Sequence, residues 1–374
     1  MFELLKTTGH ARRARLTVNH GTIETPFFMP IATRGAVKSL SSDDLRDLQA
    51  QIVLSNTYHL LLRPGRDGMK QLGGLHAFMN WQGPILTDSG GYQVFSLAKM
   101  NEIADDGVAF QSHIDGRRIK LTPAGSMAMQ SAIGSDVVMQ FDDVAAGNST
   151  KERYEEAMER SLRWARECKD TYDQRQQLFG IVQGGVYEDL RSRSIQGLLD
   201  LNFDGYAIGG LSVGESREAT FRTTKFVAAQ LPTDKPRYFM GGGMPEEIVL
   251  AVSVGVDMFD CVLPTRNARH GTLFVWKGNP TECVSRALTL AQDGAPDEMI
   301  ANVLYEKMII GKEAFRYDVT PIDPYLDVAA IKHCTKAYLH HLFRTEELLG
   351  LRFATLQNLG FYLRLMHELR AALS

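Results

Sequence analysis

Short apolar runs separated by longer amphipathic stretches dominate the pattern of this chain. There are eight such runs, most of which end on a polar residue or a glycine, at residues 26–32, 51–56, 84–91, 136–143, 178–185, 205–210, 237–243 and 256–261. Apolar runs of this length, bounded by turn residues, are typical of buried parallel strands, and the stretches between them are long enough for helices. Eight repeats of this unit predict an α/β fold, a (β/α)8 TIM barrel.

Two hairpin signals and a helical tail predict what surrounds the barrel. Residues 13–25 and 108–121 alternate apolar and polar positions around Asn-His-Gly and Asp-Gly turns, so we expect an N-terminal hairpin at the barrel floor and a second hairpin at its mouth. Ser149-Thr150 predicts the N-cap of a helix over the following periodic residues. Residues 280–307 predict two short helices. The tail at 332–373 is strongly helical, and we expect Gly350 and Gly360 to break it.

Length, charge and cysteine content limit the class of protein. The 374 residues suit a barrel with additions, and we place the barrel at 1–275 and an appended lobe at 276–374. A net charge of −3 gives no global attraction to polyanions, so a nucleic acid would need a local patch. Four scattered cysteines fit a reducing cytosol. With no secretion signal and no run near the ~20 apolar residues of a membrane span, we expect a cytoplasmic protein without membrane contact.

Polar side chains end four of the predicted strands, where the chemistry of a (β/α)8 barrel collects. They are Asp88, Asp142, Gln183 and Asp260. The Ser-Gly-Gly turn after Asp88 lets the backbone pass close to a ligand and places the ring of Tyr92 beside it, although the same turn also suits a phosphate nest. Gln183 and the glycine-rich residues 209–215 suit the polar edge of a planar heterocycle.

The eighth predicted strand carries the strongest chemical signal. Asp260 is followed closely by Arg266 and Arg269, and two guanidinium groups beside a carboxylate suit a ribose-phosphate substrate. A nucleophilic aspartate with a second carboxylate nearby suits displacement at a sugar carbon with retention. A buried Arg–Asp ion pair accounts for the same residues structurally, and these residues alone leave both interpretations open.

Several long segments, in one order, resemble the tRNA-guanine transglycosylase family. They are IATRGAVKSL (31–40), SNTYHLLLRPG (55–65), GGLHAFMNWQGPILTDSGGYQVFSL (73–97), LFGIVQGGVYEDLR (178–191), GYAIGGLSVGE (205–215), DMFDCVLPTRNARHG (257–271) and AYLHHL (337–342). The resemblance implies a barrel with an appended lobe. It also implies an enzyme of queuosine biosynthesis that exchanges the wobble guanine of GUN anticodons in tRNA for a 7-deazaguanine, without ATP.

The resemblance further implies a role for each candidate residue. Asp260 resembles the nucleophile that attacks the anomeric ribose carbon to form a covalent Asp-ribosyl intermediate, and Asp88 resembles the general acid/base. The residues that resemble base-binding positions are Tyr92, Asp142, Gln183, Gly210, Leu211 and Met240, with Tyr92 and Met240 as the two sides of a stacking slot. Arg266 and Arg269 match arginines that hold the tRNA anticodon loop.

Two pocket positions bear on the incoming base, and they disagree. Val144 stands where enzymes that use 7-aminomethyl-7-deazaguanine usually have cysteine and queuine-using enzymes have valine. Val213 stands where queuine-using relatives have glycine, which leaves room for the cyclopentenediol of queuine. Because valine would fill that room, we favour 7-aminomethyl-7-deazaguanine and keep queuine as the alternative.

The lobe departs from the family's zinc site, which has three cysteines spaced C-x-C-x-x-C and a downstream histidine. Alignment on Asp323-Pro324 and on AYLHHL places other residues at all four ligand positions: Leu326, Val328, Ile331 and Gln357. We therefore predict no structural zinc and no other cofactor, with apolar burial in place of the metal. Residues 278–306 also look like a helical insertion relative to the family.

Two other functions remain compatible with the sequence. One is a non-catalytic tRNA-binding subunit of a heteromeric transglycosylase, and the other is a barrel enzyme acting on a deazaguanine in DNA or in a free nucleoside. The first is disfavoured because the chain keeps all four candidate site residues, Asp88, Asp142, Gln183 and Asp260, and a non-catalytic subunit would not need a nucleophile. The resemblance suggests a homodimer, although the changed lobe leaves the oligomeric state open.

Overall fold

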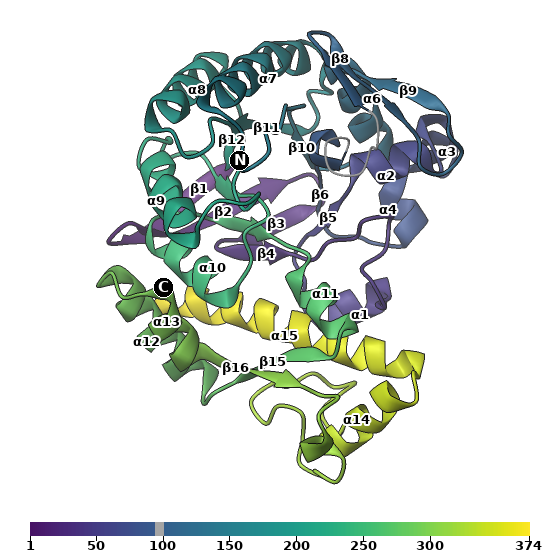
Figure 1. The fold of residues 1–374 in the computed structure, drawn as a ribbon, viewed down its shortest axis with the longest axis vertical. Coiled ribbons are helices and arrows are strands. Elements are labelled where there is room, and N and C mark those ends of the chain that lie inside the picture. The colour runs from purple at the N-terminus through teal and green to yellow at the C-terminus, as the bar shows by residue number, and fades with distance from the viewer. Residues whose placement is uncertain (94–100) are drawn as a thin grey trace.

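A closed parallel barrel forms the centre of the molecule (Figure 1), in a computed structural model that describes residues 1–93 and 101–374. The eight strands follow the order β4 (Phe27–Met29), β14 (Met258–Asp260), β13 (Arg237–Phe239), β12 (Gly205–Ile208), β11 (Gln177–Val182), β10 (Val137–Met139), β6 (Ile85–Thr87) and β5 (Val53–Ser55). A parallel bridge between Ile31 and Leu54 joins the first strand to the last. The predicted (β/α)8 barrel is confirmed, with one strand in each predicted run.

The barrel strands are apolar throughout because both of their faces are buried. Successive residues of a strand point to opposite faces. Met258 of β14 belongs to the cluster inside the barrel, while Phe259 packs outward under the surrounding helices. Leu16 and Ile23 join the inner cluster from the N-terminal sheet. Continuous apolar runs, rather than alternating ones, are therefore the expected signature of these strands.

Two small antiparallel sheets flank the barrel at the predicted hairpins. β1 (Phe2–Thr8), β2 (Ala11–Val18) and β3 (Gly21–Glu24) form the sheet that covers the barrel floor, where Leu16 and Ile23 are buried. β7 (Asn101–Ala104), β8 (Gly107–Gln111) and β9 (Arg118–Leu121) form the second sheet, between β6 and β10 in sequence. Both predicted hairpins are confirmed.

Helices connect the strands and cover the outside of the barrel (Figure 1). They are α1 (Ser42–Asp47), α2 (Thr57–Leu62), α3 (Arg66–Gln71), α4 (Gly74–Met79), α6 (Pro123–Ile133), α7 (Lys151–Thr171), α8 (Glu188–Leu201), α9 (Arg217–Ala228), α10 (Pro245–Ser253) and α11 (Leu263–Arg269). The predicted cap of α7 is confirmed, since the Thr150 side chain accepts a hydrogen bond from the Arg153 amide. Within the described residues, none of the helices combines the length and apolar character that a membrane crossing requires.

The C-terminal part of the chain adds a second layer beside the barrel. Its elements are β15 (Thr272–Trp276), α12 (Pro280–Gln292), α13 (Asp297–Leu304), β16 (Tyr305–Ile309), the 3-10 helix η1 (Glu313–Phe315), α14 (Lys336–Arg344) and α15 (Leu348–Ala372). The two predicted helices within 280–307 are confirmed. In Figure 1 the yellow α15 runs between the barrel and these elements. The predicted boundary between residues 275 and 276 falls within β15, and the division into two domains stays a prediction.

Gly350 and Gly360 do not break the C-terminal helix, and this expectation was wrong. α15 continues through both residues. A Cβ at Gly360 would lie 3.0 Å from Val328 Cγ2 and 3.2 Å from Leu326 Cδ2, and one at Gly350 would lie 3.1 Å from Leu342 Cβ. These glycines are places where the helix closely approaches its neighbours, and side-chain packing there offsets their weak helix propensity.

Candidate active site

Asp260 lies at the carboxyl end of β14, and its side chain is oriented by two donors on one oxygen. Oδ1 accepts a hydrogen bond from the Tyr238 hydroxyl at 2.6 Å and from the Gly241 amide at 2.9 Å. Burial raises the pKa of the Asp260 carboxyl, and the two hydrogen bonds act against that rise. The result is a buried carboxylate held in one orientation at the barrel mouth.

Asp88 follows β6 and is fixed by residues at the start of α2. Oδ1 accepts a hydrogen bond from the Thr57 amide at 2.8 Å, and Oδ2 accepts one from the Asn56 side chain. Burial raises the pKa of Asp88 to about 6, and the negative charge of Asp260 adds to the rise. The two carboxylates are therefore within electrostatic reach, and Asp88 can gain or lose a proton near neutral pH.

Asp142 and Gln183 are brought together from neighbouring strands. Gln183 Nε2 donates to Asp142 Oδ2 at 2.8 Å, and the Ser89 hydroxyl donates to Asp142 Oδ1 at 2.9 Å. Burial raises the pKa of Asp142 to about 6, with the charge of Asp143 contributing. Asp143 points the other way and pairs with Arg153 and with another arginine of α7. Only the first of the two consecutive aspartates therefore faces the pocket, as alternation along the chain predicts.

The glycines after β12 let the backbone run directly beside Gln183. A Cβ at Gly210 would overlap the Gln183 side-chain oxygen, and φ there is +62°. A Cβ at Gly209 would overlap Ile181 and would lie 3.5 Å from Met240 Sδ. Only glycine fits such an approach. Leu211, the next residue, is buried.

The predicted stacking residues, Tyr92 and Met240, are linked to this set through two glycines. Met240 follows β13 and borders Gly209, while Tyr92 follows Gly91, where a Cβ would lie 3.0 Å from Asp142 Oδ1. The Tyr92 side chain is 49% exposed, so part of it is accessible to a ligand. The structure thus brings the predicted base-binding residues around one end of the barrel.

The two predicted specificity positions lie on loops that touch. Val144 is buried, and three residues later a Cβ at Gly147 would overlap the carbonyl of Val213. Glu215 shapes the second loop, because its carboxylate accepts hydrogen bonds from the amides of Ser212 and Val213, the latter at 3.1 Å. The two valine positions are therefore carried by loops that pack on each other.

Arg266 and Arg269 lie on α11, directly after Asp260. Arg269 Nη1 donates to the Thr265 carbonyl at 2.9 Å, and Arg266 is exposed. Across residues 1–93 and 101–374, neither arginine comes within 4.0 Å of a carboxylate oxygen, so no Arg–Asp pair forms with Asp260. Both cations remain available to a phosphate at the barrel mouth.

Three site residues were missed from sequence alone, Asn56, Arg191 and Tyr238, and the sequence indicated a turn at Ser89 but not its side-chain contact with Asp142. Arg191 of α8 is fully buried and donates to the carbonyls of Gly185 and Val182, each at 2.7 Å, and of Gly209 at 2.8 Å. It therefore ties the loop of Gln183 to the loop of Gly210, and burial lowers its pKa to about 9. Its partners are backbone carbonyls, which leave no signal in a single sequence.

The zinc-ligand positions of the lobe do not fit a metal. The three aliphatic side chains, Leu326, Val328 and Ile331, are buried and have no lone pair to donate. Gln357 is 1% exposed, and its Nε2 donates to the Phe274 carbonyl at 2.9 Å and to Asp323 Oδ2 at 3.2 Å. The lobe is instead closed by apolar packing of Leu326 and Val328 on Gly360, together with this amide.

One histidine–carboxylate group in the described part of the chain lies at the barrel floor. His20 Nδ1 is 2.8 Å from Asp136 Oδ1, and His76 Nε2 is 3.6 Å from Asp136 Oδ2. The two imidazole rings stack, with centroids 3.7 Å apart, so an ion shared by both would lie far out of each ring plane. Asp136 also accepts the amides of His20 and Ile85, which indicates a structural link between the floor sheet and β6.

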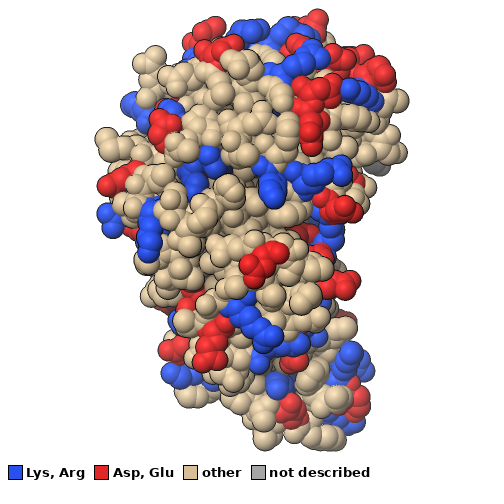
Figure 2. Space-filling model, turned by 90° about the vertical axis from the view of Figure 1, so that its left-hand side faces the viewer, with Lys and Arg blue, Asp and Glu red and all other residues tan. Residues whose placement is uncertain are grey.

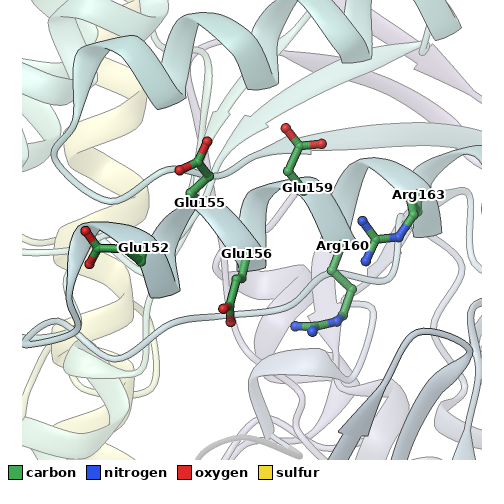
Figure 3. Close-up of a pocket in the computed structure, with 6 residues that line it drawn as sticks. All are labelled: Glu152, Glu155, Glu156, Glu159, Arg160 and Arg163. Carbon is green, nitrogen blue, oxygen red and sulfur yellow. The ribbon is translucent and has the colours of Figure 1, made fainter.

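A hollow of about 460 Å³ on α7 lies outside the site (Figure 3). Glutamates and arginines of α7 line it, namely Glu152, Glu155, Glu156, Glu159, Arg160 and Arg163. Glu155 and Glu159 point to one side, where Arg193 of α8 pairs with both at 2.5 Å. These charges join neighbouring helices on the outside of the barrel and are not the predicted site.

A closed parallel barrel with buried carboxylates at the carboxyl ends of its strands defines a (β/α)8-barrel enzyme. The sequence family described as queuine tRNA-ribosyltransferase matches residues 7–374. Proteins named queuine tRNA-ribosyltransferase are similar over the whole chain: that of Tolumonas auensis at 48% identity, covering 93% of the relative, and those of Vibrio cholerae and Acinetobacter baylyi at 46%, covering 92% and 90%. The chain belongs to the queuine tRNA-ribosyltransferase family, a family of glycosyltransferases.

Proposed function

We propose that this protein is a tRNA-guanine transglycosylase that replaces the wobble guanine of GUN anticodons with a 7-deazaguanine. The observation that carries the proposal is the presence of two buried carboxylates at the barrel mouth, Asp260 and Asp88. Each has different hydrogen-bond partners, and the charge of Asp260 affects the pKa of Asp88. Asp260 is oriented by donors on one oxygen, and Asp88 has its pKa raised to about 6. Two carboxylates in such different surroundings can take different roles, one as the nucleophile and the other as the general acid/base.

The first half-reaction removes guanine. An Asp260 carboxylate oxygen attacks C1′ of the ribose, the C1′–N9 bond breaks, and its electron pair goes to the purine. Asp88, whose pKa of about 6 lets it exchange a proton close to neutral pH, supplies from its protonated form the proton that neutralises the departing base. The second half-reaction reverses these steps with the new base, which loses its N9 proton to Asp88 as the Asp260–ribose bond breaks.

Base recognition in this proposal uses the set around Asp142. Its carboxylate accepts N–H groups of the guanine edge, the Gln183 amide contacts the same edge, and the backbone at Gly210 and Leu211 adds polar groups. Tyr92 and Met240 would stack on the two faces of the ring. Since Gln183 and Ser89 already hold Asp142, little rearrangement is needed on binding.

Binding of the anticodon loop is assigned to Arg266 and Arg269, which have no carboxylate partner in the part of the chain that the structure describes. On the face drawn in Figure 2, basic and acidic side chains are interspersed, in keeping with the net charge of −3. Local contacts rather than a general field would therefore position the RNA. A tRNA substrate would place the protein in the cytoplasm.

The test of this function is incorporation of labelled guanine into unmodified tRNA, with and without a metal chelator. We expect Asp260-dependent incorporation into tRNAs with GUN anticodons and none into DNA or free guanosine. A non-catalytic subunit would give no incorporation alone but would restore it when an active partner is added. Incorporation into DNA would instead support the other alternative considered above.

We also propose that the enzyme needs no zinc, since aliphatic side chains and Gln357 fill the lobe positions. In the same assay, chelator is expected to leave both the exchange rate and the melting temperature unchanged. Metal analysis should find well under one zinc per chain. A stoichiometric zinc that chelator removes, with loss of stability, would contradict this proposal.

A pH dependence follows from Asp142, whose pKa is raised to about 6 by burial. Its ionised form accepts the N–H groups of guanine, and protonation removes that acceptor as the pH falls through 6. We expect the KM for guanine to rise toward about tenfold per pH unit below 6 and to be nearly constant above 7. Steady-state kinetics from pH 5 to 8 would check this, with Asp142→Asn as the control that abolishes the dependence. A flat KM in the parent would contradict it.

Among incoming bases we propose 7-aminomethyl-7-deazaguanine, because a valine side chain at position 213 would fill room that glycine would leave for queuine. The backbone at Val213 lies against Gly147 of the loop that follows Val144. Val213→Gly should raise queuine incorporation by about tenfold or more, and it should leave aminomethyl-base incorporation within a few-fold. Val144→Cys is the matched variant on the facing loop, with a smaller expected effect. If the parent incorporates queuine faster than the aminomethyl base, Val144 is the more informative position and the proposal is wrong.

A homodimer is our proposal for the assembly. Large apolar side chains are exposed on the C-terminal elements, among them Tyr317, Val319, Tyr325 and Tyr338. Exposed apolar side chains can contribute to an association surface when they gather in one patch. Sedimentation velocity should show a dimer at micromolar concentration, and a monomer at all concentrations would contradict the proposal.

A further inference from the structure

The two hydrogen bonds to Asp260 are both made to the same carboxylate oxygen. The Tyr238 hydroxyl and the Gly241 amide donate to Oδ1, at 2.6 and 2.9 Å. Among residues 1–93 and 101–374, no donor forms a hydrogen bond with Oδ2. The two oxygens therefore have different roles available to them: one is held by the protein, and the other keeps its lone pairs for a substrate.

We propose that Asp260 attacks through Oδ2 and that Tyr238 is a positioning residue whose hydroxyl, bound to Oδ1, promotes release of the ribose from the covalent intermediate. This inference rests on the proposed function, because it assumes that Asp260 is the nucleophile. It adds which oxygen reacts and which half-reaction Tyr238 serves.

The charge on Asp260 explains why the hydroxyl favours release. In the free enzyme the carboxylate carries a full negative charge shared by its oxygens. When Oδ2 bonds to C1′ and the C1′–N9 electron pair leaves with the base, Oδ1 becomes the carbonyl oxygen of a neutral ester. When the new base attacks C1′, the C1′–Oδ2 pair returns to the carboxylate and the charge on Oδ1 is restored. A hydrogen bond to Oδ1 is strongest in the charged state, so it stabilises that state relative to the ester.

The surroundings of Tyr238 support an oriented donor rather than a mobile one. Its ring lies in the cluster inside the barrel, beside Met258 of the neighbouring strand, and the side chain is fully buried. Burial raises the pKa of the Tyr238 hydroxyl well above its usual value, so it stays protonated and can only donate to the carboxylate. Gly241, with φ of +73°, turns the backbone amide toward the same oxygen.

The test compares the parent with Tyr238→Phe, using anticodon stem-loop RNA. Hydrogen bonds to charged groups are worth about 1.5–3 kcal/mol, which corresponds to about tenfold to a hundredfold in an equilibrium. We expect the ratio of covalent adduct to free enzyme, at fixed guanine concentration, to rise by that factor. Most of the change should be a slower discharge of the isolated adduct by added guanine. Tyr206→Phe, a buried tyrosine of the outer cluster on the adjacent strand, is the matched control and should leave both values unchanged.

Each outcome of this experiment either supports or overturns the proposed role of Tyr238. An unchanged adduct ratio, or an adduct that disappears while the melting temperature is retained, would overturn the role of Tyr238. A parent enzyme without any Asp260-dependent adduct would overturn the proposed function, and this inference with it. If Tyr238→Phe does not fold, 3-fluorotyrosine at position 238 keeps the shape and strengthens the donor. It should lower the adduct ratio, and an equal or higher ratio would overturn the inference.

Discussion

Asp260→Asn is expected to abolish the covalent adduct with anticodon stem-loop RNA and to reduce guanine exchange by at least about a thousandfold. An amide oxygen is a poor nucleophile, and it cannot form the neutral ester that the carboxylate forms. The fold should survive, because Tyr238 and Gly241 can still donate to the asparagine oxygen. Denaturing gels that detect the adduct, together with exchange kinetics, would measure both effects.

A matched carboxylate elsewhere on the barrel gives the control for this variant. Asp200 is exposed at the end of α8, and Asp200→Asn should behave as the parent in both assays. Melting temperature and RNA affinity close to parental values would show that Asp260→Asn is folded. Full exchange activity in that folded variant would contradict the assignment of the nucleophile, and with it the proposed reaction.

The second large effect is expected at Asp88. Asp88→Asn cannot move a proton, so departure of guanine and arrival of the new base should both slow, by about a hundredfold to ten-thousandfold. The adduct should still form slowly, because Asp260 is intact, and this distinguishes the variant from Asp260→Asn. Single-turnover rates of adduct formation and discharge would separate the two steps.

Two results for Asp88→Asn would contradict a role of Asp88 in proton transfer. A kcat within a few-fold of the parent at every pH between 5 and 8 would remove Asp88 from the proton transfer. A change in KM alone would mean that its hydrogen bonds to Asn56 and Thr57 only shape the pocket. Asn56→Ala is a useful companion, since loss of that donor should raise the pKa of Asp88 further and shift its pH profile upward.

The barrel was predictable from sequence because burial on both faces leaves a strong local signature. Each strand is a short apolar run. In β14 the consecutive residues Met258 and Phe259 are both apolar, because one lies in the cluster inside the barrel and the other in the cluster outside it. The candidate carboxylates were also predictable, since strand ends mark where chemistry collects. Asp142 and Asp143 show the limit: consecutive residues point to opposite sides, and the structure shows that Asp142 meets Gln183 while Asp143 pairs with Arg153.

Features that depend on distant partners were not predictable. Arg191 donates to the Gly209 carbonyl, 18 residues later, and Tyr238 donates to Asp260, 22 residues later, and neither pairing is marked in the sequence. Gly350 and Gly360 were misinterpreted for the same reason: helix propensity is local, whereas the approach of Gly360 to Val328 is made by tertiary packing. Sequence patterns therefore predict whether a residue is buried better than they predict which distant residues it contacts.

The position of α15 has a consequence for how the chain folds as it is synthesised. This helix packs on the first barrel strand: the Tyr362 ring lies 5.0 Å from that of Phe28, and Arg370 donates to the Pro26 carbonyl, 344 positions earlier, at 2.9 Å. Contacts of such sequence separation form only after both segments have left the ribosome. The side of β4 that α15 covers therefore stays exposed until translation is nearly complete. During this interval a nascent chain would depend most on chaperones.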